Sequence, residues 1–370
     1  MYKNFLRNSF ILFIVIMIII ATINLVVDPG KIYFKNVIAD NKSSDFLDKL
    51  INSKYGIIQN GWNERLIKTI LAKSASRYDC VVLGSSHIMQ LSRVRNTGNI
   101  QKQCKNLLNL GVSGGSIEDI SIFSYLILNN IKLPNKVFIG IDPWTLKFNM
   151  DSRYGAYKSS YNKMNILLNE KDTGKNKSYL ISIIKNLFNG EYFYYSIQEL
   201  LKNNLKREKE DNIFTQKISF PENNFSYETG YKEALILTDG SHLYDKAFIL
   251  KRKNNNSKIK LGGGDYKIMG KVYDIETLAY LQKIVNLYKQ NNIKVNLVLT
   301  PYHPNVFKKG DTKPVRHFEV MENIVNEFSL KNNIKVYGSY FPNKIGCVGR
   351  EFFDFMHGTN KCLNKIDFSK

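Results

Sequence analysis

The pattern of apolar and polar positions begins with one long apolar run. It extends from Phe10 to Val27 and is broken only by Thr22 and Asn24. These 18 residues, at about 1.5 Å rise per helical residue, nearly cross a hydrocarbon core of about 30 Å. The run is longer than the core of a secretory signal, and no small-residue cleavage pattern precedes Asp28. The pattern therefore predicts an uncleaved membrane anchor.

Basic residues next to this run predict its orientation. Lys3 and Arg7 precede the apolar residues, and an excess of Lys and Arg keeps a flanking segment in the cytoplasm. We expect residues 1–27 to form a cytoplasmic tip and a single transmembrane helix in the cell membrane. The main domain would then lie on the periplasmic or extracellular side.

Shorter segments after the anchor alternate between strand-like and helix-like patterns. Residues 28–78 have the pattern of a juxtamembrane connector with short helices. Strands and helices alternate over residues 79–150 and again over residues 271–370, whereas residues 151–270 lose this regularity and are interpreted as a central insertion. Strands that alternate with helices of this length predict a three-layer α/β fold, in which a parallel sheet is covered on both faces.

Several predicted strands end next to residues with useful chemistry. Ligand sites of open parallel sheets form at the carboxyl ends of the strands. We therefore expect the residues just past those ends to converge on one edge of the sheet. They are Ser86, Gly114, Asp142 and His303.

The composition adds a strong positive charge. The formal net charge is +21, which points to an acidic partner such as nucleic acid, anionic lipid or an anionic surface polymer. The basic residues are nevertheless spread along the chain, and no zinc-finger spacing or RNA-binding aromatic motif occurs. We predict no nucleic-acid partner and attribute the charge to a general bias toward Lys, Asn, Ile and Tyr.

Four cysteines are present, and their spacing is not that of a CxxC metal site, so we predict no metal. An exported chain can oxidise its cysteines. A bridge between the last two would close the loop between them, but pairing cannot be read from sequence, and four buried free thiols are the alternative. The cysteines are Cys80, Cys104, Cys347 and Cys362.

Candidate nucleophilic chemistry centres on a serine and a histidine. A serine hydroxyl becomes reactive when a base takes its proton and an acceptor fixes the tautomer of that base. Of the five histidines, only His357 has a carboxylate at short range in a loop, in the motif Asp354-x-x-His357. Among the others, His87 is expected to point away from the base, and His303 to be structural or to line the cleft.

Three motifs in this order resemble the SGNH/GDSL hydrolase superfamily. They are Gly84-Ser85-Ser86 after a first strand, N-L-G-V-S-G-G-S after a second, and D-x-x-H near the C-terminus. The resemblance covers residues 79–150 and 271–370. It implies the three-layer, flavodoxin-like fold of that superfamily.

The resemblance also implies roles for individual residues. Ser86 would be the nucleophile, His357 the general base and Asp354 the residue that orients it. The backbone N–H groups of Ser86 and Gly114 would donate to the oxyanion. The non-catalytic alternatives are that Ser86 caps a helix and that Asp354 and His357 are surface loop residues.

Two positions depart from the pattern of the superfamily. Ile141 stands where an asparagine side chain usually donates to the oxyanion, and Ser85 replaces an aspartate. Loss of one oxyanion donor costs about 2.7–4 kcal/mol of transition-state stabilisation. Asn109 and Ser113 are the candidates to substitute for it, and Asp142 would either contact substrate or cap a helix.

The serine motif and the anchor together narrow the resemblance to membrane-anchored proteins of cell-surface polymer acylation. These include alginate O-acetylation proteins and the D-alanyl-lipoteichoic acid transfer protein. The resemblance implies an extracytoplasmic serine acyltransferase or esterase that needs no cofactor. It would act on an O-acyl group of a cell-surface polysaccharide or polymer, together with a membrane-bound acyl-transfer partner.

Two other interpretations remain at this point. The first is a catalytically weak or inactive binding or assembly subunit of a cell-envelope modification system, which the departure at Ile141 favours. The second is a basic lectin-like surface protein that binds polymer through residues 151–270.

Overall fold

The structure is a computed structural model. Its described residues are 2–28, 33, 47–53, 56–58, 64–93, 97–170, 184–205, 235–244, 249–250, 271–308 and 313–369. Parts of the predicted connector and most of the predicted insertion therefore lie outside the described residues.

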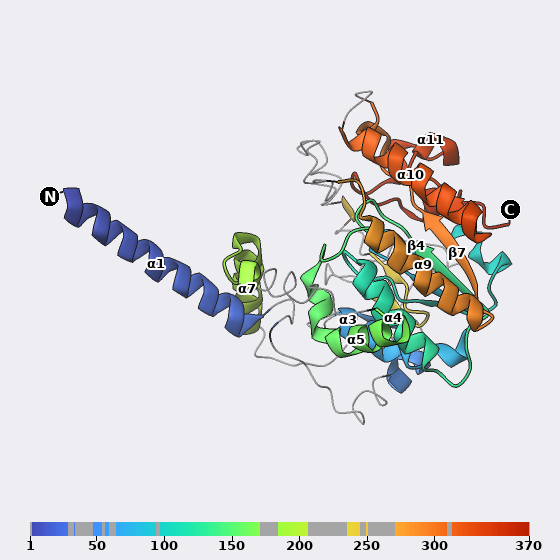
Figure 1. Ribbon diagram of the computed structural model, residues 1–370, viewed down its shortest axis with the longest axis horizontal. Helices are drawn as coiled ribbons and strands as arrows, with labels where there is room; N and C mark the ends of the chain where they lie inside the picture. Colours follow the sequence, from blue (N-terminus) through green and yellow to red (C-terminus); the bar gives the residue numbers. More distant parts are fainter. Residues whose placement is uncertain are drawn as a thin grey trace.

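The N-terminal apolar run forms one long helix, α1 (Tyr2–Val27). It projects away from the rest of the molecule (Figure 1). Only 6% of its most apolar 18-residue window is buried, so α1 is not the core helix of a globular domain. By length and composition it is able to cross a membrane, as the sequence predicts.

A five-stranded parallel sheet forms the centre of the molecule. The strand order is β3-β2-β4-β7-β8, and every neighbouring pair is parallel. This is the order of doubly wound sheets of the flavodoxin-like kind. The predicted α/β class with a parallel sheet is therefore confirmed. The strands are β2 (Cys80–Leu83), β3 (Leu107–Asn109), β4 (Lys136–Gly140), β7 (Lys294–Leu299) and β8 (Lys335–Gly338).

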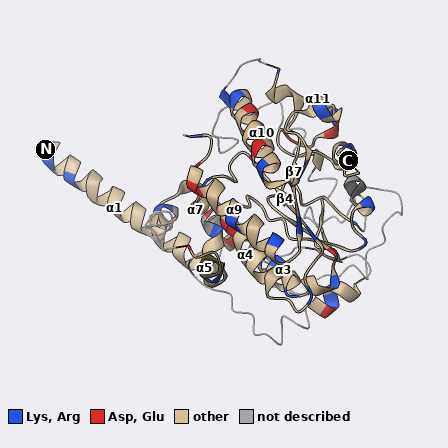
Figure 2. Ribbon diagram, turned by 45° about the vertical axis from the view of Figure 1, so that its right-hand side comes forward, with Lys and Arg blue, Asp and Glu red and all other residues tan. Residues whose placement is uncertain are grey.

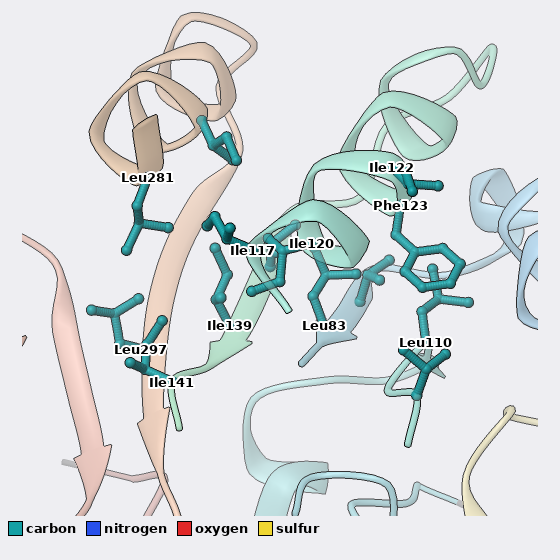
Figure 3. Packing of buried hydrophobic residues seen from close by; sticks show 14 of the residues in the cluster. Leu83, Leu110, Ile117, Ile120, Ile122, Phe123, Ile139, Ile141, Leu281 and Leu297 are labelled. Atoms are coloured by element: carbon teal, nitrogen blue, oxygen red, sulfur yellow. The ribbon is translucent and has the colours of Figure 1, made fainter. Parts of the chain in front are cut away.

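Long helices cover one face of this sheet. Figure 3 shows Ile117 and Ile120 of one helix and Leu281 of another over the strand residues Ile139 and Leu297. These residues belong to one continuous apolar core because alternate residues of a strand point to the same face. The helices on this core are α3 (Glu64–Ala72), α4 (Ile117–Leu128), α9 (Ile275–Gln290) and α10 (Lys313–Asn332).

The opposite face of the sheet has a smaller cover. The intervening strand residues Val82, Phe138 and Val298 point to this side and form a second apolar cluster. Short elements close it in place of long helices: η2 (Thr97–Lys102) and the C-terminal segment with α12 (Asn360–Leu363). Both faces are thus covered, but unequally.

The region predicted as an insertion contributes to the main core. Tyr154 of η3 (Ser152–Tyr157) and Tyr161 of α5 (Lys158–Leu167) are buried in the same core, where η3 and α5 pack against α4. Tyr161 packs beside Tyr280 with ring centroids 6.3 Å apart. Regular structure therefore continues past residue 150, because these tyrosines supply apolar area that the polar composition of the region hides.

Further along this region, β5 (Leu235–Leu237) and β6 (His242–Leu243) pair with β1 (Gly56–Ile58) in a small antiparallel sheet.

Both charge signs are interleaved on the surface, as Figure 2 shows along α9 and α10. The remaining elements are the helix α7 (Gly190–Leu205) and the short elements η1 (Ala75–Arg77), η7 (Pro304–Val306), α11 (Pro342–Ile345) and η8 (Gly349–Glu351).

Candidate functional site

The turn that carries Ser86 follows β2 directly. The carbonyl of Gly84 in this turn accepts a hydrogen bond from the N–H of Val112, at 3.0 Å. The indole Nε1 of Trp144, from the loop after β4, donates to the carbonyl of Gly115 at 3.1 Å. Three loops that follow parallel strands therefore meet at one edge of the sheet, as the strand-end argument predicts.

Ser86, His357 and Asp354 lie in a hydrogen-bonded line at this edge. The Oγ of Ser86 is 2.8 Å from Nε2 of His357. The Nδ1 of His357 lies 2.9 Å from each carboxylate oxygen of Asp354. Donation from Nδ1–H to the carboxylate leaves Nε2 unprotonated, so that it accepts from the serine hydroxyl. This geometry meets the distance requirement for activation of a serine by a general base.

The D-x-x-H motif forms a tight turn that closes on its own carboxylate. Oδ1 of Asp354 accepts from the backbone N–H of Met356 at 2.8 Å and of His357 at 2.7 Å. Burial alone would raise the pKa of Asp354, but the charge and ring N–H of His357 and the two backbone donors hold this pKa well below its usual range. The carboxylate is thus ionised wherever His357 acts as a base.

Covalent and aromatic contacts hold this turn. The disulfide Cys347–Cys362 brackets it, and Cys80–Cys104 forms a second disulfide near β2. The described residues thus contain both disulfides and no free thiol. The ring of Phe353 stacks on His357 with centroids 5.3 Å apart and planes 6° apart.

Two backbone N–H groups next to the serine are available to a ligand. Within the described chain, neither the N–H of Ser86 nor that of Gly114 donates an intramolecular hydrogen bond. Gly114 has φ 63°, which a glycine adopts without strain. A Cβ on Gly115 would lie 2.4 Å from the carbonyl oxygen of Gly84, so this glycine lets the two loops approach. Gly115 was not singled out from sequence, although the Gly-Gly pair is its signal.

Charged residues from other elements fix the neighbouring Ser113. Glu64 Oε1 accepts from the backbone N–H of Ser113 at 2.6 Å, and Oε2 accepts from its Oγ at 2.8 Å. The guanidinium groups of Arg65 and Arg153 donate to its carbonyl at 3.3 Å and 2.6 Å. The hydroxyl of Ser113 is therefore already hydrogen-bonded to Glu64 and does not supply the missing oxyanion donor.

Arg65 links this loop to helix α4. It forms a bidentate pair with Asp119, with Nε–Oδ1 at 2.8 Å and Nη2–Oδ2 at 2.9 Å. Both side chains are buried. Glu64 and Arg65 were not predicted as site residues because they lie in a segment whose pattern indicates a connector.

The other proposed substitute, Asn109, is also used internally. Its Nδ2 donates to the carbonyls of Ile88 at 2.8 Å and Leu91 at 2.9 Å, and its Oδ1 accepts from the N–H of Gly111 at 2.9 Å. Asn109 is fully buried and is a structural residue beneath the serine turn. Ile141 is buried at 1% exposure and offers no donor at all.

His87 contradicts its expected orientation. Its ring lies against that of His357, with centroids 4.6 Å apart, because the turn after β2 and the C-terminal turn that carries His357 meet at the same edge of the sheet. Burial, and next the charge of His357, hold the pKa of His87 well below its usual value, so the ring is neutral. Its Nδ1 is 3.8 Å from Oδ1 of buried Asp142, whose backbone N–H donates to Thr145.

His303 has a structural position. Its Nδ1 accepts from the backbone N–H of Asn305 and so caps η7. The ring packs edge-on against Phe352 and Phe355. His303 thus buttresses the segment that carries His357 and does not contact Ser86.

The described residues contain no group of three or more His, Cys, Asp or Glu side chains placed to hold a metal ion. Comparison with models of protein families and with curated proteins finds no match to the chain.

Proposed function

We propose that the chain is a membrane-anchored, extracytoplasmic serine acyltransferase or esterase of the SGNH type. One observation carries the proposal: the line of hydrogen bonds from Ser86 Oγ through His357 to Asp354. Ser86 and His357 are 271 positions apart in sequence, and Asp354 and His357 are 3 positions apart, yet their side chains meet there. Two unused backbone N–H groups beside the serine support it further.

In the first half-reaction, Ser86 takes an acyl group from an ester donor. His357 Nε2 removes the Ser86 proton while Oγ attacks the carbonyl carbon. The N–H groups of Ser86 and Gly114 donate to the oxyanion that develops. The tetrahedral intermediate then collapses, the bond to the donor alcohol breaks, and that alcohol leaves with the proton held by His357.

In the second half-reaction, a hydroxyl group displaces the acyl group from Ser86. His357 takes the proton of the attacking hydroxyl and returns it to Ser86 Oγ as the ester bond breaks. A sugar or polymer hydroxyl as acceptor makes the protein a transferase, and water makes it an esterase.

The exposed apolar helix α1 supports the location and hence the substrate class. Two basic residues precede the apolar run of α1, and by the positive-inside rule they favour an orientation in which the rest of the chain lies outside the cytoplasm. Two disulfides are consistent with an oxidising compartment. Together with the resemblance to polymer-acylation proteins, these features favour an O-acyl group of a cell-surface polymer as substrate, handed over by a membrane-bound partner.

A serine-reactive fluorophosphonate tests this proposal on the purified protein. Wild type and a Ser85→Ala control are expected to take the label, whereas Ser86→Ala is not. His357→Gln is expected to slow labelling by about 10²–10⁴-fold, because general-base assistance is lost. The proposal that the protein is a serine enzyme is rejected if wild type and Ser86→Ala are labelled equally, or if neither is labelled.

One observation favours a second candidate, a catalytically weak assembly or binding subunit. The position of the usual oxyanion amide holds the buried side chain of Ile141, and Asn109 and Ser113 are committed elsewhere. This candidate predicts that Ser86 takes the label slowly while acyl transfer is undetectable. An active Ser86 that also turns over an acetyl ester would eliminate it.

A further inference from the structure

Helix α7 presents an apolar surface that the catalytic site does not use. Tyr194 and Leu201 lie seven residues apart, hence on one face of the helix, and are 59% and 52% exposed. Ile184 and Phe188, just before α7, are exposed as well. Large apolar side chains gathered on one short element indicate an interaction surface.

The opposite face of α7 is bound to the membrane-crossing helix α1. The hydroxyl of Ser196 donates to Oδ1 of Asn24 at 2.9 Å, and Asn24 Nδ2 donates to the carbonyl of Leu187 at 2.9 Å. The hydroxyl of Tyr192 donates to Oδ1 of Asp28 at 2.7 Å. Two residues correspond to about 200° around a helix, so Tyr194 points away from the face that carries Tyr192 and Ser196.

These contacts explain an anomaly in the apolar run. Asn24 interrupts an otherwise apolar membrane segment, yet it is fully buried: Ser196 of α7 donates to its Oδ1, and its Nδ2 donates to the carbonyl of Leu187 just before α7. Polar residues in a membrane span face other protein elements and not lipid, because an unpaired amide in hydrocarbon is costly. Asn24 therefore marks the side of α1 that α7 covers.

The same contacts fix the level of α7 relative to the bilayer. Asn24 lies three residues before Val27, the end of the apolar run, which corresponds to about 4.5 Å along the helix axis. Ala21 and Met17, one and two turns earlier on the same stripe, are also partly covered. An element held there lies at the outer boundary of the hydrocarbon core when α1 spans the bilayer.

We propose that α7 is an interfacial helix that lies in the outer leaflet of the membrane, with its Tyr194–Leu201 face toward lipid. Figure 1 shows α7 beside the C-terminal part of α1, with the two helix axes inclined to one another. Tyr192 and Tyr194 of α7 carry the amphipathic aromatic side chains that favour the interface. The anchor thus has two parts, a span and a surface helix.

The proposal concerns membrane contact alone and is independent of the acyl-transfer chemistry. It rests on α1 spanning the bilayer. A surface helix clamped to α1 restricts the tilt of the domain above the membrane, which a single flexible tether does not do.

Site-directed nitroxide labelling of the full chain tests the proposal. Single cysteines are introduced as Tyr194→Cys or Leu201→Cys, since all four native cysteines are in disulfides. The labelled protein is placed in vesicles of phosphatidylcholine and phosphatidylglycerol. Collision rates are measured with oxygen, which concentrates in hydrocarbon, and with a water-soluble nickel chelate. Leu330→Cys, at a residue 81% exposed on α10, is the aqueous control, and Ile14→Cys on α1 is the lipid control.

The oxygen-to-nickel ratio at Tyr194 and Leu201 is expected to exceed that at Leu330 several-fold and to approach that at Ile14. An aqueous ratio at both α7 sites overturns the proposal. Low collision rates with both reagents also overturn it, because another protein surface would then cover the face. An aqueous ratio at Ile14 shows that α1 does not span the bilayer, which removes the basis of the proposal.

Discussion

Two segments flank Ser86, and the protein holds them by different physical means. Residues 111–116, which carry Gly114, are fixed by charged side chains from α3 and by Arg153. Residues 347–362, which carry Asp354 and His357, are fixed by a disulfide and by aromatic packing. The proposed oxyanion side of the site is therefore electrostatically positioned, whereas the base side is covalently positioned.

The two sides of the site are expected to lose their positions under different conditions. Buried charges depend on their partners and on pH, because an unpaired charge in the interior is strongly unfavourable. A disulfide is indifferent to these changes but is removed by reduction. The two sides are thus separable by experiment.

The largest expected effect is on the electrostatic side. Arg65→Met leaves Asp119 buried without its bidentate partner and is expected to lower the free energy of unfolding by about 3–5 kcal/mol. Chemical denaturation measures this change. Arg153→Ala removes the other arginine of this loop, whose side chain is 36% exposed, and is expected to cost only about 1 kcal/mol or less. Equal losses in the two variants would show that the Arg65 pair does not hold the loop.

The disulfide side is expected to respond to loss of its bridge. Replacing Cys347 and Cys362 together by serine should cost about 3 kcal/mol, the value for a loop of about 15 residues. Fluorophosphonate labelling at Ser86 should slow as well, because the His357 turn is less confined. The matched pair, Cys80→Ser with Cys104→Ser, should cost similar stability yet leave labelling nearly unchanged. Slower labelling in both pairs alike would contradict a specific role for the 347–362 bridge.

The stability of the electrostatic side is expected to depend on pH through Glu118, the residue before Asp119. Burial raises the pKa of Glu118, in the first turn of α4, to about 7. The folded state then binds this proton more tightly than the unfolded state, so stability is lost as pH rises from about 4.5 to 7. Glu118→Gln should remove this loss and add about 2–3 kcal/mol at pH 8 while changing little at pH 4. Thermal unfolding at both pH values measures it, and a variant that stabilises equally at both would reject the assignment.

The smallest effect is on positioning of Gly114. Glu64→Gln keeps one acceptor for the Ser113 N–H but loses the charge, at a cost of about 0.5–1.5 kcal/mol. The labelling rate at Ser86 should fall severalfold, while the circular dichroism spectrum stays unchanged. Ser113→Ala keeps the backbone hydrogen bond to Glu64 and should label faster than Glu64→Gln. The reverse order would indicate that the hydroxyl, not the backbone, positions the loop.

The sequence was sufficient for the features that depend on local pattern. Strand-like runs ending at Ser86 and Gly114 predicted the parallel sheet and the convergence of its loops. The D-x-x-H spacing predicted a carboxylate against its own histidine.

Contacts between residues that are far apart in sequence could not be predicted from the sequence. Glu64 and Ser113 are 49 residues apart, and Arg65 and Asp119 are 54 apart, so no local pattern signals either pair. Asn109 has the right chemistry for an oxyanion donor, but its partners Ile88 and Leu91 come from another segment. Only the folded structure shows that the amide of Asn109 is already hydrogen-bonded.

Trapping of an acyl group on Ser86 tests the central claim most directly. The protein is mixed with 4-nitrophenyl acetate, quenched in acid, and examined by intact mass and peptide mass spectrometry. We expect a mass increase of one acetyl group that maps to Ser86, is absent in Ser86→Ala and forms much more slowly in His357→Gln. An acetyl group that maps elsewhere, or that forms equally fast without the His357 imidazole, would contradict a nucleophile activated by this histidine.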